Sequence, residues 1–219
     1  MKRLQITLIL FSALMLISCN LLQALTPDQP ETPQPTPTFT EAPPTPTPTE
    51  EPHEALTLEA SAELVITALA EMDFETVAAF VHPEMGLRFS PYTYVEETHL
   101  VFFPDELVDL MESEELFLWG VYDGTGDPIE MTFADYYDAF IYSADFANPE
   151  EMAVNEELGW SSMINNIEAF YPGSSFVEYH FSGFEEEYGG MDWRSLRLVL
   201  IEEDDTWFLV GIVNDMWTI

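Results

Sequence analysis

The stretch WRSLRLVLIEEDDTWFLVGIV, from Trp193 to Val213, carries two apolar runs separated by the four acidic residues 202–205. The two runs predict antiparallel strands, and the acidic residues between them predict the turn that joins the strands. Gly211 predicts a bend in the second strand, which continues towards residue 219. This hairpin decides the fold, because its apolar face needs a second layer to cover it.

The hairpin also contains two of the three arginines that follow residue 53. Side chains alternate along a strand, so Arg194 and Arg197 point to opposite faces. Arg194 shares its face with the leucines at 196, 198 and 200, and we therefore expect it to be the buried arginine. A buried guanidinium is costly without a carboxylate partner, so the sequence predicts a structural ion pair at Arg194. An anion-binding site that combines Arg194 with Arg88 is the alternative.

The covering layer is predicted at the start of the domain. Apolar residues recur at helical spacing from Leu58 to Met72, and Asp73 is placed to cap a second helix that ends at His82. Before the hairpin, the stretch SSFVEYHFSG (174–183) alternates between apolar and polar residues and predicts another strand. The predicted fold class is therefore α+β, with N-terminal helices packed on a curved, mostly antiparallel sheet.

Short elements are predicted between these two ends: an extended segment at 86–95, a helix at 104–112, a hairpin at 116–131 and a helix at 164–171. The glycines at 124 and 126 supply the turn of that hairpin. Thr132 and Asp135 form the pattern of a capping box, which predicts the start of a further helix.

Composition limits the partners of the domain. Residues 54–219 contain 36 acidic side chains against three arginines, which gives a net charge near −33. Nucleic acids and anionic lipid headgroups demand the opposite charge, so DNA and RNA are excluded as partners, whereas divalent cations are attracted. These 166 residues contain no cysteine, so packing without disulfides must stabilise one core.

The N-terminus has the layout of a secretory signal. Lys2 and Arg3 precede an apolar run from Leu4 to Leu16, and Cys19 is the one cysteine of the chain. The residues before Cys19 resemble the lipobox of bacterial lipoproteins, which implies a signal peptide at 1–18 and a diacylglycerol anchor on Cys19. Two acyl chains hold a protein stably on the extracellular or periplasmic side of the cell membrane. An ordinary secretory signal with an incidental cysteine is the alternative.

A tether is predicted between the anchor and the domain. Thr26–His53 contains ten prolines and eight threonines in 28 residues, with almost nothing to bury. Such a segment is extended, and at ~3.1 Å per residue it reaches up to roughly 85 Å. The predicted organisation is a signal peptide at 1–18, a lipidated tether at 19–53 and one globular domain at 54–219.

One stretch is a candidate metal loop. DGTGD, from Asp123 to Asp127, places two carboxylates, a hydroxyl and two glycines together. It departs from an EF-hand loop at Pro128 and Ala134. A plain hairpin turn, with loose and diffuse cation binding, is the competing interpretation.

Other candidate site residues are scattered. His82 and His180 lack the spacing of a zinc enzyme, and no nucleotide or nucleophile fingerprint occurs, so no cofactor is predicted and no catalytic residue is assigned. His180 and Asp192 are candidates for an acid–base pair, whereas His82, next to Pro83, is better explained by packing at a helix end. The ligand-binding candidates are Arg88, Arg194, Arg197, His82, His180 and Asp192. Aromatic candidates for a cavity wall, with core packing as the alternative, are Tyr92, Tyr94, Tyr136, Tyr137, Trp193 and Trp217.

Two segments resemble the ends of NTF2-like domains: ALAEMDFETVAAFVHPE (68–84) and TWFLVGIV (206–213). The resemblance implies a cone-shaped α+β domain with a pocket. Four other segments are similar to segments of uncharacterised bacterial lipoproteins: VHPEMGLRFSPY (81–92), YDGTGDPIEMTFADYY (122–137), MDWRSLRLV (191–199) and LVGIVNDMWTI (209–219). That family implies no particular activity.

Three functions are compatible with the sequence. The one we favour is a surface-tethered, non-catalytic module that binds a small molecule, a peptide or an envelope protein. The second is an NTF2-like pocket enzyme that uses a histidine and a carboxylate, such as His180 and Asp192. The third is a structural envelope protein whose acidic surface binds cations. A histidine and a carboxylate that converge in a pocket would favour the enzyme.

Overall fold

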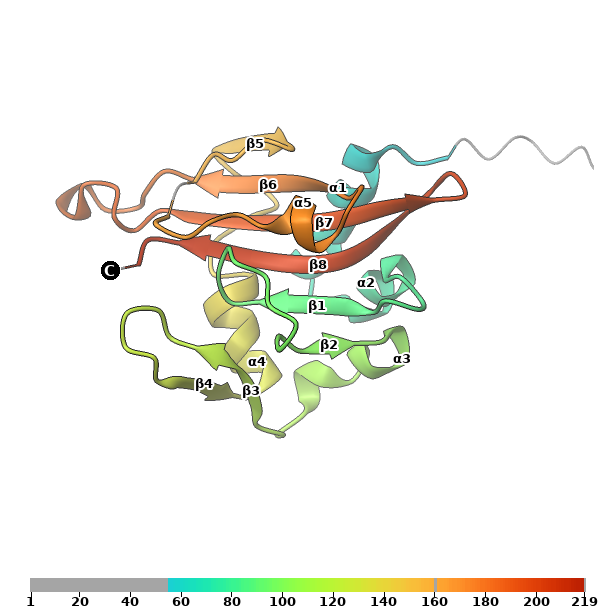
Figure 1. Ribbon diagram of the computed structural model, residues 1–219, viewed down its shortest axis with the longest axis horizontal. Coiled ribbons are helices and arrows are strands. Elements are labelled where there is room, and N and C mark those ends of the chain that lie inside the picture. The colour runs from blue at the N-terminus through green and yellow to red at the C-terminus, as the bar shows by residue number, and fades with distance from the viewer. Residues whose placement is uncertain (1–54, 160, 219) are drawn as a thin grey trace, which may run out of the picture. The chain divides into compact units, whose positions relative to one another are not determined.

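A six-stranded mixed sheet forms the centre of the domain in the computed structural model, which describes residues 55–159 and 161–218. The strand order is β2-β1-β8-β7-β6-β5 (Figure 1). The strands are β1 Leu87–Ser90, β2 Val101–Phe102, β5 Glu151–Val154, β6 Ser175–Phe181, β7 Arg194–Glu203 and β8 Thr206–Met216. Neighbouring strands are antiparallel except β1 and β8, which run parallel. The predicted α+β class and mostly antiparallel sheet are confirmed, whereas Cys19 and the tether lie outside the described residues.

β7 and β8 form the predicted hairpin. Asp204 and Asp205 make its two-residue turn, and their φ angles of 49° and 60° are those of a type I′ turn. The register shifts between Val199, which faces Gly211, and Leu200, which faces Leu209. One extra residue in β8 therefore forms a β-bulge, and the bend predicted at Gly211 falls at this bulge.

Two helices cover one face of the sheet. α1 (Leu58–Ala70) is followed by α2 (Phe74–Phe80), which Asp73 caps by accepting a hydrogen bond from the Thr76 N–H at 3.0 Å. The prediction that the first helix extends to Met72 is wrong. α1 ends at Ala70, and Met72 lies exposed in a turn with a φ of 56°. α2 likewise ends before the predicted His82.

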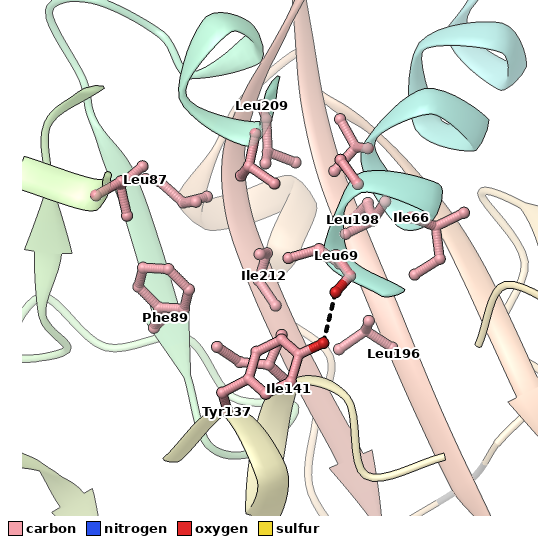
Figure 2. Packing of buried hydrophobic residues seen from close by; sticks show 14 of the residues in the cluster. Ile66, Leu69, Leu87, Phe89, Tyr137, Ile141, Leu196, Leu198, Leu209 and Ile212 are labelled. Atoms are coloured by element: carbon pink, nitrogen blue, oxygen red, sulfur yellow. Dashed lines mark hydrogen bonds between the residues drawn. The ribbon is translucent and has the colours of Figure 1, made fainter. Parts of the chain in front are cut away.

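The main core lies between these helices and the sheet. Figure 2 shows Leu69 of α1 among Leu196, Leu198 and Ile212 of β7 and β8, all fully buried or nearly so. The Tyr137 hydroxyl donates a hydrogen bond to the Leu69 carbonyl oxygen, which satisfies its polar atom inside the core. Burial of each such aliphatic side chain contributes about 1.5–3 kcal/mol, so this layer fixes α1 on the sheet.

The predicted hairpin at 116–131 forms a separate two-stranded sheet of β3 (Phe117–Val121) and β4 (Pro128–Met131). Trp119 stacks on Tyr136 with 3.9 Å between ring centroids, which joins this hairpin to the core. The predicted helix at 104–112 divides into α3 (Pro104–Leu107) and the short turn η1 (Leu110–Glu112). Thr132 caps α4 (Phe133–Tyr136) as predicted, and the wider π-helical turn η2 (Tyr137–Ile141) continues it.

The second face of the sheet is covered mainly by loops. Segments 91–99 and 161–171 pack against it together with Gly159, and the second segment includes α5 (Ile167–Phe170) (Figure 1). A short turn, η3 (Glu186–Tyr188), lies in the β6–β7 connection. The helix predicted at 164–171 is shorter than expected, since Ile164 lies outside it and is 75% exposed. The buried polar side chains on this face form the candidate site.

Candidate functional site

Three charged side chains from adjacent strands are buried together on the second face of the sheet. The Arg197 Nε on β7 donates to Glu178 Oε2 on β6 at 2.7 Å, and its Nη2 donates to Asp215 Oδ2 on β8 at 2.9 Å. The exposed fraction of the three residues is 0–2%. Nη1 donates to the Thr93 hydroxyl, which ties segment 91–99 to the sheet. We refer to Arg197, Glu178 and Asp215 as the ion cluster.

The ion cluster holds Arg197 in its charged form. Burial disfavours the guanidinium charge, but the charges of Glu178 and Asp215 and their hydrogen bonds outweigh burial and raise the pKa of Arg197. Glu178 is satisfied on its other oxygen as well, because the Gly159 N–H donates to Oε1 at 2.8 Å. The cluster therefore locks three strands and two covering segments together.

The ion cluster contradicts the prediction that Arg194 is the buried, paired arginine. Arg194 lies half-buried at the start of β7, where Nη1 donates to the carbonyl oxygens of Asp192 and Trp193 at 3.4 and 3.0 Å. No carboxylate forms a salt bridge with it among the residues that the structure describes. Burial lowers the pKa of Arg194, and the Asp192 charge opposes that effect. The prediction was wrong because loops cover the face of the sheet on which Arg197 lies. Strand alternation alone does not reveal that this face is covered.

Arg88 donates its hydrogen bonds to backbone carbonyl oxygens and does not form an anion site. Its Nη1 donates to the carbonyl oxygens of Glu96 and Glu97 at 3.2 and 3.0 Å and to that of His99. The guanidinium lies 5.2 Å from the centroid of the Phe170 ring, in cation–π contact. Through these hydrogen bonds, Arg88 fixes segment 91–99. Arg88, Arg194 and Arg197 all lie outside the linings of the two pockets described below.

A pocket of about 530 Å³ opens next to the ion cluster, where β7 begins and β8 ends. Its apolar walls are Leu158, Met191, Trp193 and Trp217, and its polar lining is Ser161, Ser162, His180, Ser182 and Thr218. Trp193 is 6% exposed and Trp217 is 43% exposed, so one indole is buried in the wall and the other reaches solvent. We name this the tryptophan pocket. Among the residues that the structure describes, no Asp, Glu, Lys or Arg lines it.

A buried serine orients His180 in the tryptophan pocket. The His180 Nδ1 lies 2.8 Å from the Ser195 Oγ. Ser195 is fully buried under Gly159, where a Cβ would stand 2.6 Å from Ser195 Oγ and 2.5 Å from Trp193 Cζ3. Ser195 is therefore closed off from the pocket and acts as a hydrogen-bond partner of the imidazole, not as a nucleophile.

The predicted acid–base pair of His180 and Asp192 is not formed. Asp192 Oδ2 accepts hydrogen bonds from the N–H groups of Phe184 and Glu185 at 3.0 and 2.8 Å, which fixes the β6–β7 connection. Burial opposes ionisation of Asp192, but these hydrogen bonds and the Arg194 charge outweigh burial and lower its pKa. The carboxylate thus stabilises a loop beside the pocket.

Glu150 is a carboxylate near His180 that sequence reasoning missed. Its Oε2 accepts from the Ser182 N–H and hydroxyl at 2.9 and 2.8 Å, and its own N–H donates to the His180 carbonyl oxygen at 3.1 Å. The Ser182 bonds lower the pKa of Glu150, with a smaller contribution from His180. Because this carboxylate lies outside the pocket lining, it does not complete an acid–base pair there.

Asp123 and Asp127 lie in the β3–β4 turn, as the sequence predicted. Two hydrogen bonds close the turn: the Tyr122 N–H donates to the Asp127 carbonyl oxygen at 2.8 Å, and the Asp127 N–H donates to Thr125 Oγ1 at 3.2 Å. The Asp123 N–H donates to the Tyr92 hydroxyl at 3.3 Å, outside the turn. Within 55–159 and 161–218, no group of three or more His, Cys, Asp or Glu side chains is arranged to hold a metal ion. The geometry supports the interpretation as a plain hairpin turn.

A second pocket, of about 640 Å³, lies between the β3–β4 turn and segment 91–99. Its lining includes Tyr92, Tyr94, Glu96, His99, Tyr122 and Asp123. We name it the tyrosine pocket. Four of the six aromatic cavity candidates therefore line pockets, two in each, whereas Tyr136 and Tyr137 are core residues.

His82 stabilises local backbone. Its Nδ1 accepts hydrogen bonds from the N–H groups of Glu84 and Met85, both at 3.1 Å, and its Nε2 lies 3.2 Å from Glu203 Oε1. The ring also packs edge-on against Phe208. This supports the interpretation that His82 packs at a helix end, and it lines neither the tryptophan nor the tyrosine pocket.

Sequence reasoning missed the residues that build this face. One signal was available: residues 198–201 of β7 and 208–213 of β8 are apolar without alternation, a pattern that fits strands buried on both faces. Gly159 and the serines beside it carried no signal, because their segment has no periodicity.

Comparisons with known proteins add little to this description. No family model matches the chain, and no curated protein matches it. A crystal structure described as a calcium/calmodulin dependent protein kinase II association domain, from Xanthomonas campestris, is similar with a TM-score of 0.31 and 11% identity, over 73% of this chain and 84% of that chain. A similarity this low carries no argument about function. Within the described part of the chain, no helix has the length and apolar character to cross a bilayer.

Proposed function

We propose that the protein is a lipid-anchored surface protein whose domain binds a small, neutral, polyhydroxylated ligand, such as a sugar, in the tryptophan pocket without transforming it. The observation that supports this proposal is the absence of charged side chains from the described lining of the pocket. The domain contains 36 acidic residues among 166, yet the lining described by the structure contains no carboxylate, lysine or arginine. Such a lining offers no ionic partner to either a cation or an anion.

The lining matches the chemistry of a neutral sugar. The flat indoles of Trp193 and Trp217 provide apolar faces for the C–H side of a sugar ring. Four hydroxyl side chains and His180 provide donors and acceptors for its hydroxyl groups. The net charge near −33 around the pocket further disfavours anionic ligands.

Two features support a binding role over catalysis. The His180 Nδ1 is engaged by a serine that the pocket does not reach. The carboxylates of Asp192 and Glu150 are both used to hold the β6–β7 connection. An acid–base pair would require a carboxylate and the histidine to converge on one point of the pocket.

The sequence supports the location and the finer fold. The lipobox resemblance at Cys19 and the Pro/Thr-rich tether together favour a domain held at a distance from the outer side of the membrane. The order of elements, two N-terminal helices followed by a sheet that ends in long antiparallel strands, supports an NTF2-like domain.

A series of sugars that differ in charge tests the binding proposal. Calorimetric titration of the full-length protein in detergent should detect N-acetylglucosamine, which is neutral, and should detect neither glucosamine, a cation, nor glucuronate, an anion. Trp217→Ala should weaken binding about tenfold, because the substitution removes an aromatic wall. Trp207→Ala, at the opposite end of β8, is the matched control and should bind normally. Equal binding of all three sugars, or normal binding by Trp217→Ala, contradicts the proposal.

A further inference from the structure

The tyrosine pocket differs from the tryptophan pocket in the chemistry of its walls. Three tyrosines line it, and two carboxylates lie among them: Glu96 from segment 91–99 and Asp123 from the β3–β4 turn. No lysine or arginine lines it among the residues that the structure describes. Aromatic faces and carboxylates both attract cations, so the chemistry of these walls favours a different class of ligand from that of the tryptophan pocket.

The walls of the tyrosine pocket are held in place. Tyr92 and Tyr122 both pack on Phe140, with ring centroids 6.1 and 6.4 Å apart, and the Tyr92 hydroxyl accepts from the Asp123 N–H at 3.3 Å. Tyr94, two residues after Tyr92, is 47% exposed and is accessible to a ligand. Segment 91–99, which carries two of the three tyrosines, is tied down by Thr93 and by Arg88.

The charges of the pocket are negative on balance. Glu96 keeps a defined position, because the Thr98 hydroxyl donates to its Oε2 at 3.2 Å. The buried His99 ring is the one basic group in the described lining, and its Nδ1 accepts from the Glu96 N–H at 3.2 Å. Burial lowers the pKa of His99, Arg88 adds to that effect and Glu96 opposes it, which favours the neutral ring.

We infer that the tyrosine pocket binds a methylated ammonium group, the cationic headgroup found in choline and in trimethylated amines. The tyrosine faces contact the methyl groups through cation–π attraction, and Glu96 and Asp123 balance the charge. A metal ion fits less well, because the described residues place no three metal-binding side chains together. An anion would meet two carboxylates, and the described lining offers no lysine or arginine to offset them. The inference does not depend on the function proposed for the tryptophan pocket.

Choline and dimethylbutanol, its neutral carbon isostere, form the first test. The two molecules have nearly the same shape and differ in charge, so their comparison isolates the cation. Titration of full-length protein, followed by tyrosine and amide NMR shifts, should show choline binding at the tyrosine pocket and at least a tenfold weaker effect of the isostere. Phosphocholine, as a lipid-headgroup analogue, should bind more weakly than choline, because its phosphate approaches the same carboxylates. Equal binding of choline and its isostere, or no choline-dependent shift, overturns the inference.

Paired variants form the second test. Tyr94→Ala should weaken choline binding about 5- to 30-fold, the range expected for one cation–π contact of about 1–2 kcal/mol. Tyr188→Ala removes a similarly exposed tyrosine elsewhere and should have no effect. Glu96→Gln should weaken binding, whereas Glu97→Gln, on the next residue, should not. Binding that survives both Tyr94→Ala and Glu96→Gln contradicts the inference. Trp217→Ala should leave choline binding unchanged, which separates this test from that of the sugar pocket.

Discussion

Replacement of Arg197 by methionine tests the packing of the second face most severely. Methionine retains much of the length and apolar character of the arginine side chain, so the substitution removes charge and hydrogen bonds more than volume. It leaves Glu178 and Asp215, both at most 2% exposed, without the guanidinium that now balances them. It also releases Thr93, and with it one tie to segment 91–99.

The expected loss of stability is large. Removal of one partner from a buried ion pair costs about 3–5 kcal/mol, since the remaining charge stays buried without compensation. For a domain of this size, each kcal/mol lowers Tm by about 2–4 °C, so the variant should melt about 6–20 °C below the wild type. Arg194→Met is the matched control. Its guanidinium is half-buried and bonds to backbone carbonyl oxygens, so its Tm should fall by only a few degrees.

Thermal melts followed by circular dichroism measure both variants. A normal Tm for Arg197→Met, or equal losses for the two arginine variants, would refute the reasoning.

Three further predictions concern other parts of the chain. Intact mass of the membrane-extracted protein should show diacylglycerol on Cys19, and Cys19→Ala should release a soluble product; an unmodified thiol on native protein would count against the anchor. Gly159→Ala should cost about 1–3 kcal/mol and weaken sugar binding, because the new methyl group stands 2.5 Å from Trp193 Cζ3; unchanged melting would show that the segment moves freely. Asp73→Ala should lower Tm at pH 7, since Thr76 hydrogen bonds lower the pKa of Asp73 and stabilise the charged cap. The difference in Tm between the variant and the wild type should disappear as pH falls below 3.8, the ordinary pKa of this carboxyl group. A difference in Tm that persists below this pH would contradict the role of Asp73 as a charged cap.

Local chemistry made some elements predictable. The hairpin follows from two apolar runs around an acidic turn, and the caps at Asp73 and Thr132 follow from side chains that satisfy free backbone N–H groups. Boundaries were less accurate where one residue changes the backbone direction. Met72 is apolar and lies at helical spacing, yet it adopts a left-handed turn because the chain must reverse between α1 and α2.

The candidate site depends on contacts that no local pattern encodes. Whether Arg194 or Arg197 is buried depends on Gly159 and on loops 91–99 and 161–171, which return from distant parts of the sequence to cover one face. The tyrosine pocket is formed by segment 91–99 and the β3–β4 hairpin, and the tryptophan pocket by the β6–β7 connection and the end of β8, so the aromatic candidates were identifiable as residues but not as two separate groups. The predicted pair of His180 and Asp192 does not form for a related reason, because the Asp192 carboxylate accepts hydrogen bonds from the backbone of its own loop.

The indole signals of the five tryptophans test the central claim most directly. In a two-dimensional amide NMR spectrum, each indole N–H gives its own peak, and addition of N-acetylglucosamine should report which rings contact the ligand. The account predicts dose-dependent shifts for Trp193 and Trp217 and none for Trp119, which is buried in the core, or Trp207. Shifts confined to Trp119 or Trp207, or no shift in Trp193 and Trp217 when sugar binds, would contradict it.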